Sequence, residues 1–313
     1  MIKELIIHPD ELSVKWIDRL ADADVEVLGI HSVGGNDAAL HLSKMLDLMK
    51  NEEFRRLIDY ANSRGLEIVY ELHAAGYLMP KEHFDAHPEY YRMNEEGERT
   101  ADHNLCVSSS DALSLFARNA ARLAKSLYGS SDKYYFWMDD GHGTVCRCPR
   151  CKKLSPSDQQ LIAVNAMLRE IKKENPKAQM AYLAYMDSIV TPNETVAEEG
   201  VFLEYAPFEK YTATGDNSAQ LIRQEAEAVP ALLEFFGRED AKVLEYWYDN
   251  SLRSNWTKPP KKFVIDKDGM KRDLTEYRVL GFPSVASFAC YLGEDYEALH
   301  GDIDIMPFKE YAE

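Results

Sequence analysis

The sequence has no long uninterrupted apolar run. No segment approaches the roughly 18 uncharged residues that a membrane-spanning helix needs. The first residues, MIKELIIHPDELSVKW, also lack a basic stretch followed by an apolar one, so no signal peptide is expected. Only five of the 313 residues are cysteine, an odd number that does not fit the disulfide framework of a small secreted domain. We therefore expect a cytoplasmic protein without membrane association.

Basic residues are scarce as well. The 36 Lys and Arg residues are outnumbered by 53 Asp and Glu residues, and the formal net charge is -17. This charge repels phosphate backbones, so nucleic acid is not an expected partner. The chain also lacks a Gly-rich phosphate loop, a GxSxG elbow and an HExxH helix. Nucleotide, serine-hydrolase and zincin chemistry therefore have no motif support, and no organic cofactor is expected.

One pattern of strand, loop and helix runs through the whole chain. Apolar residues make up 45% of it, which indicates a folded globular protein. Strands are predicted at 2–7, 25–31, 66–73, 133–138, 179–185, 201–205, 242–248 and 284–291. Helices are predicted at 13–21, 37–64 with a break near Lys50, 111–128, 157–174, 193–198, 218–236, 269–280 and 294–300.

Eight such units without a flexible linker favour an α/β fold, a single (β/α)8 TIM barrel over residues 1–313. Two separate domains are the alternative. Long loops are predicted after strand 3 (residues 74–110, with a hairpin turn at MNEEGER) and after strand 7 (residues 251–267). Ser157 and Gln160 predict a capping box at the start of one helix. Aromatic and imidazole side chains of the first loop either line a sugar subsite or anchor the loop: Tyr77, His83, His87, Tyr90 and Tyr91.

Two adjacent carboxyl groups, Asp139 and Asp140, follow the fourth predicted strand. The carboxyl ends of barrel strands converge on one cavity, which is where such barrels assemble active sites. Two carboxylates in such a cavity cannot both ionise freely, so one holds a proton while the other stays charged, as glycosidic bond cleavage requires. This predicts a glycosidase with an oligosaccharide or glycoside substrate. A solvated pair at a turn beginning at Gly141 is the alternative.

Further strand-end side chains are predicted to bind this substrate, the aromatic ones by stacking on sugar faces. They are His31, Glu71, His73, Tyr185, Glu204, Tyr205, Trp247, Asp249 and Tyr291. Two other readings use the same residues. His31, Glu71, His73, Glu204 and Asp249 would suit a divalent metal in a sugar isomerase-like barrel. The other alternative function is a carbohydrate-binding barrel without catalysis.

The cysteines cluster around residue 150. Cys148 and Cys151 have the spacing of a zinc knuckle, and Cys146 adds a third thiol. Cys106 is the best candidate for the fourth ligand, and His142 is the second candidate. A structural zinc here would hold the loop that carries the aspartate pair. Reduced thiols or a disulfide are the alternatives, and Cys290 is expected in the core.

Three motifs carry a family resemblance: HFDAHPEYYRMNEEGERT, LCVSSSDAL and DDGHGTVCRCPRCKKLSPSDQQL. Over residues 66–186 the chain resembles an uncharacterised bacterial family of glycoside-hydrolase-like TIM barrels, close to the β-N-acetylhexosaminidases and O-GlcNAcases. The resemblance implies that Asp139 orients a substrate 2-acetamido group as internal nucleophile. It implies that Asp140 is the acid and base of a retaining, substrate-assisted reaction.

Overall fold

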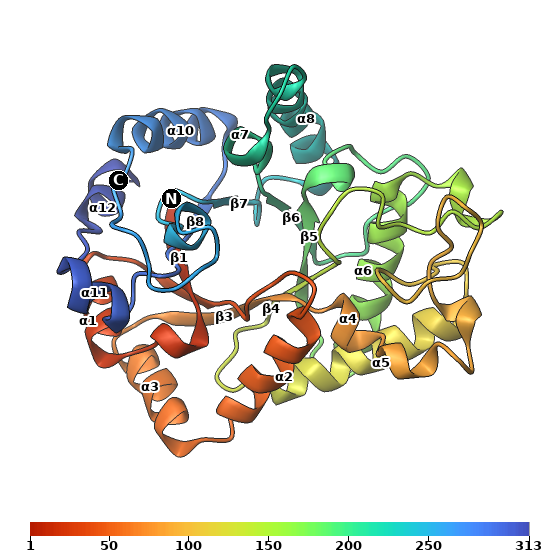
Figure 1. The fold of residues 1–313 in the computed structure, drawn as a ribbon, viewed down its shortest axis with the longest axis horizontal. Helices are drawn as coiled ribbons and strands as arrows, with labels where there is room; N and C mark the ends of the chain where they lie inside the picture. The colour runs from red at the N-terminus through yellow and green to blue at the C-terminus, as the bar shows by residue number, and fades with distance from the viewer. Residues whose placement is uncertain (313) are drawn as a thin grey trace.

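Eight parallel strands close into a barrel in chain order, β1 to β8, with the helices outside it (Figure 1). This computed structural model describes residues 1–312. The arrangement confirms the predicted (β/α)8 barrel. The strands are β1 (Ile2–Ile7), β2 (Val27–Ile30), β3 (Glu67–His73), β4 (Lys133–Trp137), β5 (Gln179–Ala184), β6 (Val201–Tyr205), β7 (Lys242–Glu245) and β8 (Ser284–Phe288).

The helices pack around this barrel through their apolar faces. The longer ones are α1 (Val14–Asp22), α2 (Ala38–Leu48), α3 (Glu52–Ser63), α5 (Ser110–Ser126), α6 (Pro156–Lys172), α8 (Ser218–Phe236), α10 (Lys267–Leu280), α11 (Glu294–His300) and α12 (Met306–Ala312). Single turns are α4 (Ala75–Leu78), α7 (Glu209–Thr212) and α9 (Asn250–Arg253), with 3-10 turns at Pro9–Glu11, Lys81–His83, Pro88–Tyr90, Cys151–Lys153 and Met186–Ser188.

Side chains on each strand alternate between the barrel interior and the helix layer. On β4, Tyr135 and Trp137 belong to the interior apolar cluster, whereas Tyr134 and Phe136 pack outward against the helices. This alternation decides which strand-end residues reach the barrel mouth.

The interior of the barrel also contains a buried ion cluster. Nζ of Lys242 lies 3.1 Å from a carboxylate oxygen of Glu4 and 3.2 Å from one of Glu204, and it also contacts Glu71. The ammonium group lies 3.8 Å from the ring centre of Tyr135. Burial raises the pKa of Glu71 and of Glu204, and the Lys242 charge opposes that shift. One cation thus compensates several buried acids.

The segment between β5 and β6 differs from the prediction. Residues 193–198 form no helix in the described structure, because side chains of α6 hold their backbone. Oδ1 of Asp158 accepts hydrogen bonds from the backbone N–H groups of Asn193, Glu194 and Thr195 at 3.1, 2.8 and 2.9 Å. Asn165, also on α6, holds the carbonyl of Val196 and the N–H of Glu198 at 2.8 and 2.9 Å, and the predicted helix at 193–198 is wrong.

Helix α6 begins earlier than predicted. Ser155 is its N-cap, and the capping box joins Ser155 to Asp158, with proline at the first helical position. The predicted box of Ser157 and Gln160 is therefore wrong by two residues. The Ser157 hydroxyl instead donates to the carbonyl of Val190.

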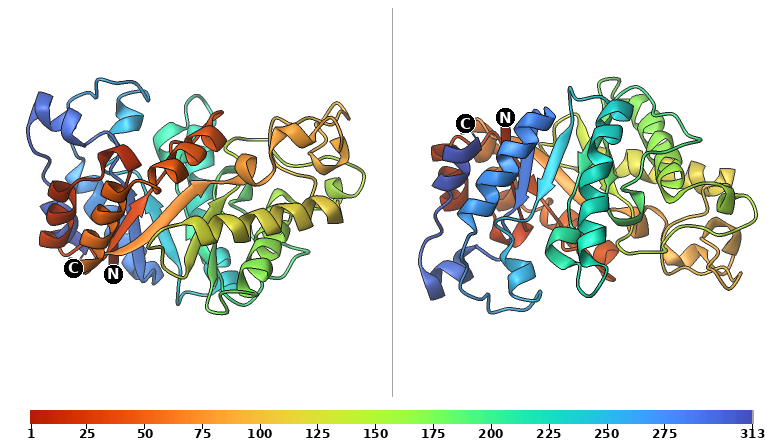
Figure 2. Two further views of the ribbon diagram at one scale, coloured as in Figure 1. Left: turned by 90° about the horizontal axis from the view of Figure 1, so that it is seen from below. Right: turned by 90° about the horizontal axis from the view of Figure 1, so that it is seen from above.

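The loops after β3 and β4 extend beyond the barrel on the same side (Figure 2, orange and yellow-green). The MNEEGER segment makes the predicted turn. Antiparallel bridges pair Met93 with Arg99 and Tyr91 with Leu105, and Asn94 N donates to the carbonyl of Glu98 at 2.8 Å. This hairpin brings the two loops together.

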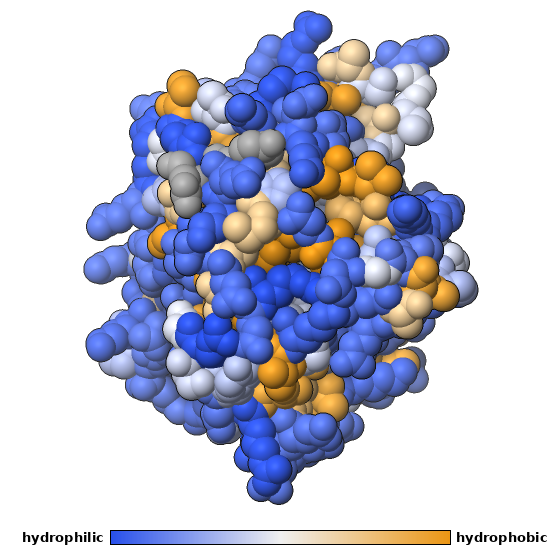
Figure 3. All heavy atoms as spheres, turned by 90° about the vertical axis from the view of Figure 1, so that its left-hand side faces the viewer, coloured by the Kyte–Doolittle hydropathy of each residue, from blue (hydrophilic) through white to orange (hydrophobic). Residues whose placement is uncertain are grey.

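The face on the side of α1, α11 and α12 is largely hydrophilic, with apolar side chains in small separate patches (Figure 3). Among residues 1–312, no helix is both long enough and apolar enough to span a bilayer.

Candidate functional site

A cavity of about 390 Å³ opens at the carboxyl ends of the strands. Its volume lies in the range of small-molecule sites. Five of the predicted substrate-binding residues line it. They are His31, His73, Tyr185, Asp249 and Tyr291. His8 lines it too, at the end of β1.

Three histidines on neighbouring strands have fixed ring orientations. Nδ1 of His8 lies 2.9 Å from the carbonyl of His31, and Nδ1 of His31 lies 2.7 Å from the carbonyl of Glu71. Nδ1 of His73 lies 3.2 Å from the carbonyl of Met138. A carbonyl only accepts, so each Nδ1 carries a hydrogen and each ring has its Nε2 left for another partner. Burial, reinforced by His73 and His8, lowers the pKa of His31 well below its ordinary value.

The two aspartates occupy different surroundings although they are adjacent in the chain. Asp140 lines the cavity, and its Oδ2 lies 3.4 Å from Nε2 of His73. Asp139 does not line it, and its backbone N–H donates to Oδ1 of Asn104 at 2.9 Å. Burial raises the pKa of the Asp139 carboxyl. Asp140 is therefore the member of the pair that can contact a molecule in the cavity.

Aromatic rings form a continuous arc along the cavity wall. Ring centres of Tyr185 and Phe208 lie 5.3 Å apart, those of Phe208 and Tyr246 5.1 Å, and those of Tyr246 and Phe288 5.3 Å. Trp137 adds an indole to the same lining. Such broad apolar surfaces suit the faces of sugar rings. Sequence reasoning missed Phe208, Tyr246 and Phe288, although strand alternation places the last two inward.

Two predicted carboxylates lie inside the barrel instead of at its mouth. Glu71 and Glu204 are ion-paired with Lys242, and Glu204 also accepts from Nε1 of Trp137 at 2.7 Å. Neither lines the cavity. This corrects their assignment as substrate-binding residues, and it also breaks up the ligand set of the isomerase-like reading.

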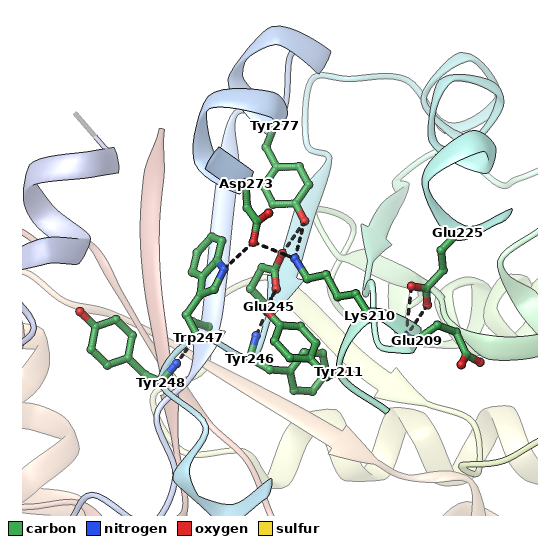
Figure 4. A network of polar contacts seen from close by, with 11 residues as sticks. Glu209, Lys210, Tyr211, Glu225, Glu245, Tyr246, Trp247, Tyr248, Asp273 and Tyr277 are labelled. Carbon is green, nitrogen blue, oxygen red and sulfur yellow. Dashed lines mark hydrogen bonds and ion pairs between the residues drawn. The ribbon is translucent and has the colours of Figure 1, made fainter. Parts of the chain in front are cut away.

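Two predicted aromatic residues face the helix layer. Trp247 donates from Nε1 to Asp273 on α10 at 2.9 Å, beside the Lys210 and Glu245 ion pair (Figure 4). Tyr205 packs on Phe282, with ring centres 6.3 Å apart. Tyr205 is the last residue of β6, and Trp247 lies two residues beyond the end of β7. Both side chains belong to the apolar layer between the barrel and the helices. Their assignment to substrate binding is therefore corrected as well.

A second hollow adjoins the first. This groove of about 1040 Å³ runs between α2, the turn of α4, the hairpin and α5. Asp139, Asp140 and His73 line its inner end. The loop after β3 therefore forms one wall of this groove. Tyr77 and Tyr91 belong to the lining, whereas His83, His87 and Tyr90 do not.

The loop after β4 is tied to its neighbours through His142. Nδ1 of His142 lies 2.6 Å from Oδ1 of Asp187, and Nε2 lies 3.5 Å from Oε1 of Glu209. Gly143 N donates to Oδ2 of Asp187 at 2.6 Å. The hydrogen bond with Asp187 raises the pKa of His142. His142 is therefore engaged with carboxylates and is not part of the cysteine cluster.

Four buried thiols gather between the loops after β3 and β4. The sulfur atoms of Cys106, Cys146, Cys148 and Cys151 all lie within 4.8 Å of one another, so they could hold a metal ion. Sγ of Cys106 lies 3.7 Å from that of Cys148 and 3.8 Å from that of Cys151, too far for a disulfide. In the described part of the chain, this is the one compact group of metal-ligating side chains.

Neighbouring groups support the cluster. Met93 N donates to Sγ of Cys146 at 3.4 Å, and Cys151 N donates to Sγ of Cys148 at 3.4 Å. The amide of Gln159 on α6 accepts from Cys146 N at 3.0 Å and donates to the carbonyls of Cys146 and Cys151 at 3.2 Å. These contacts orient the ligands from outside, as a metal site requires.

Comparison with protein families gives one decisive match. Residues 41–227, more than half of the chain, match the family described as a domain of unknown function, DUF4838. The chain belongs to the DUF4838 family. A comparison with curated proteins gave no match.

Solved structures similar to this DUF4838 barrel include several glycosidases. A β-galactosidase from Rahnella sp. R3 matches with a TM-score of 0.60 at 14% identity, over 100% of this chain and 55% of that one. Endo-glycoceramidase II from Rhodococcus sp. matches at 0.56 and 8%, over 99% and 78%. The GH20 modules of the pneumococcal exo-β-D-N-acetylglucosaminidase StrH match at 0.51 and 10%, over 99% and 83%. At such identities these similarities show the shared fold.

Proposed function

We propose that this DUF4838 barrel is a glycoside hydrolase that acts on an oligosaccharide. The observation that carries the proposal is the position of Asp140. Its carboxyl group stands in the cavity at the barrel mouth, 3.4 Å from His73 and in a hollow lined by Trp137, Tyr185 and Tyr246. A carboxyl group beside aromatic sugar platforms is what glycosidic bond cleavage needs. The shared fold of several glycosidases supports the same conclusion.

In this proposal Asp140 is the general acid and base, and Asp139 has a separate role. The substrate-assisted reaction of an N-acetylhexosaminide assigns Asp139 to the 2-acetamido group. Asp139 adjoins Asp140 in the chain, and in this assignment it holds or orients the reacting sugar while Asp140 donates to the leaving oxygen. Five other groups are proposed to bind the sugar in the cavity: His31, His73, Tyr185, Asp249 and Tyr291.

We also propose that the cysteine cluster binds a structural zinc ion. A Zn–S bond of about 2.3 Å places the sulfur atoms of a tetrahedral site about 3.8 Å apart. The distances of 3.7 and 3.8 Å from Cys106 agree with that geometry. Zinc would join the loop after β3 to the loop that carries Asp139 and Asp140, and so would hold the pair in place.

A panel of aryl glycosides tests the function. We expect purified protein to release the aryl group from at least one member of a set of N-acetylhexosaminides, glucosides and galactosides of both anomeric forms. Asp140→Asn should remove most of the activity on substrates with poor leaving groups, because an amide cannot supply the proton. Oligosaccharide binding without hydrolysis of any member would identify a non-catalytic binding barrel instead.

A further inference from the structure

The central cavity and the groove adjoin each other at a boundary of shared lining residues. Gly35, His73 and Asp140 are the residues that line both hollows. The groove, at about 1040 Å³, has more than twice the volume of the cavity, at about 390 Å³. The proposed acid therefore stands between a small compartment and a large one.

A residue without a side chain, Gly34, lies against this boundary. A Cβ atom added at Gly34 would lie 2.8 Å from Cδ2 of His73 and 3.4 Å from Oδ2 of Asp140. The backbone after β2 thus packs directly against both side chains. A larger residue here would push into the passage between the two hollows.

The groove wall combines polar and apolar groups. Asn119 and Arg122 project from α5, and Lys81 from the turn after α4. Asn119 is fixed in place, since its Nδ2 donates to the carbonyl of Leu78 at 2.9 Å and its Oδ1 accepts from Arg122 at 3.3 Å. Tyr77 adds an apolar ring surface to the same wall. Mixed walls of this kind suit a ligand with many hydroxyl groups and apolar ring faces.

We infer that the groove binds the leaving-group side of an oligosaccharide, with the bond to be cleaved lying over Asp140. This inference rests on the proposed function. The cavity then holds the sugar whose C1 reacts, and the larger groove accommodates two or more sugar units beyond it. Asp140 donates its proton to the glycosidic oxygen, which keeps the electron pair of the broken C1–O bond. Water then adds its hydroxyl to C1 and returns its other proton to Asp140.

The test compares leaving groups on one reacting sugar. The substrates are the aryl glycoside that the protein hydrolyses and oligosaccharides of two to five units with the same sugar at the reacting end. We expect kcat/KM to rise at least tenfold between two and four units, because each added unit gains contacts in the groove. A flat series, with the aryl glycoside still hydrolysed, would overturn the groove assignment.

Two variants locate the effect in the groove. At Gly76 an added Cβ would lie 3.7 Å from Cβ of Ala39 and 3.9 Å from Oδ1 of Asp139, so Gly76→Phe directs a ring into the groove. Arg122→Ala removes an exposed side chain from the same wall and keeps the test valid if the first variant misfolds. Each should reduce kcat/KM for four units at least tenfold more than for the aryl glycoside.

Arg118→Ala is the matched control. Arg118 is exposed on α5, one turn from Arg122, and does not line the groove. It should change neither value. Equal losses on long and aryl substrates in Gly76→Phe and Arg122→Ala would contradict the inference. Absence of hydrolysis of every substrate, aryl glycosides included, would overturn the proposed function and this inference with it.

Discussion

Nε2 of His73 lies 3.4 Å from Oδ2 of Asp140, and Nδ1 of the same ring is held by the carbonyl of Met138 at 3.2 Å. The imidazole is therefore anchored on one side and offers its other nitrogen to the carboxyl group. This fixes Asp140 in the passage between the cavity and the groove. The preceding residue in the sequence, Asp139, lines the groove and not the cavity.

The two aspartates should fail differently when each is changed to asparagine. Asp140→Asn should lose about 100-fold or more in kcat on glycosides with poor leaving groups, yet keep much more activity on aryl glycosides with good ones. Rates on a series of aryl glycosides of graded leaving-group pKa measure this. Equal losses across the series would remove Asp140 from the role of general acid.

Asp139→Asn should slow every substrate to a similar degree, with the loss in kcat rather than in KM. The reason is that a group stabilising the reacting sugar acts whatever the leaving group. N-acetylhexosaminides compared with matched hexosides test the acetamido role. If the wild-type protein hydrolyses plain hexosides equally well, the substrate-assisted mechanism is wrong.

The strand positions could be predicted from the sequence because apolar runs of β-branched and aromatic residues mark them. Both β1 and β6 have the predicted bounds. The direction in which each strand side chain points was harder to predict, since a shift of one residue along the strand turns a side chain from the barrel interior to the helix layer. Glu204 and Tyr205 show this: one points inward and the other outward.

The depth of a side chain in the barrel is also invisible in the sequence. Glu71 precedes His73 by two residues on β3 and lies about 7 Å deeper, by the usual rise of a strand. It meets Lys242, which comes 171 residues later. The cysteine cluster could be anticipated because thiols have few uses together in one loop, and Cys106 joins it as predicted.

Metal content should depend on the cluster. We expect close to one zinc ion per chain, and Cys148→Ser should lose both the metal and thermal stability, because metal binding contributes to folding. Elemental analysis and thermal unfolding measure the two effects. Cys290→Ser, at a buried thiol outside the cluster, is the control and should retain the metal. Metal-free protein with unchanged stability in Cys148→Ser would contradict the proposal.

The buried ion cluster should make Lys242 important for stability. Lys242→Met leaves Glu4, Glu71 and Glu204 without their cation, which should cost about 3–5 kcal/mol of unfolding free energy. Urea denaturation measures it. Adding Glu71→Gln to this variant should recover part of the loss, since one buried acid is then neutral at every pH. A loss below about 1 kcal/mol would show that the interior is well hydrated.

Stability should also fall with rising pH because of Glu225 on α8. Both of its carboxylate oxygens accept from the backbone N–H of Glu209, at 3.0 and 3.1 Å (Figure 4). Burial, together with the Glu209 carboxylate, raises the pKa of Glu225 from 4.5 to about 7. The folded chain therefore holds this proton more tightly than the unfolded chain. Its contribution is complete below about pH 4.5 and disappears as pH rises through about 7.

Glu225→Gln removes this titration while keeping an acceptor for Glu209 N. Relative to wild type, the variant should gain up to about 3 kcal/mol of unfolding free energy between pH 4.5 and 8, the value of the full shift. Urea denaturation at several pH values gives the difference. Glu227→Gln, at an exposed position on the same helix, should leave the pH dependence as it is in wild type. A difference that does not change with pH would mean that the Glu225 carboxylate is already charged in the folded protein at low pH, held by the Glu209 N–H.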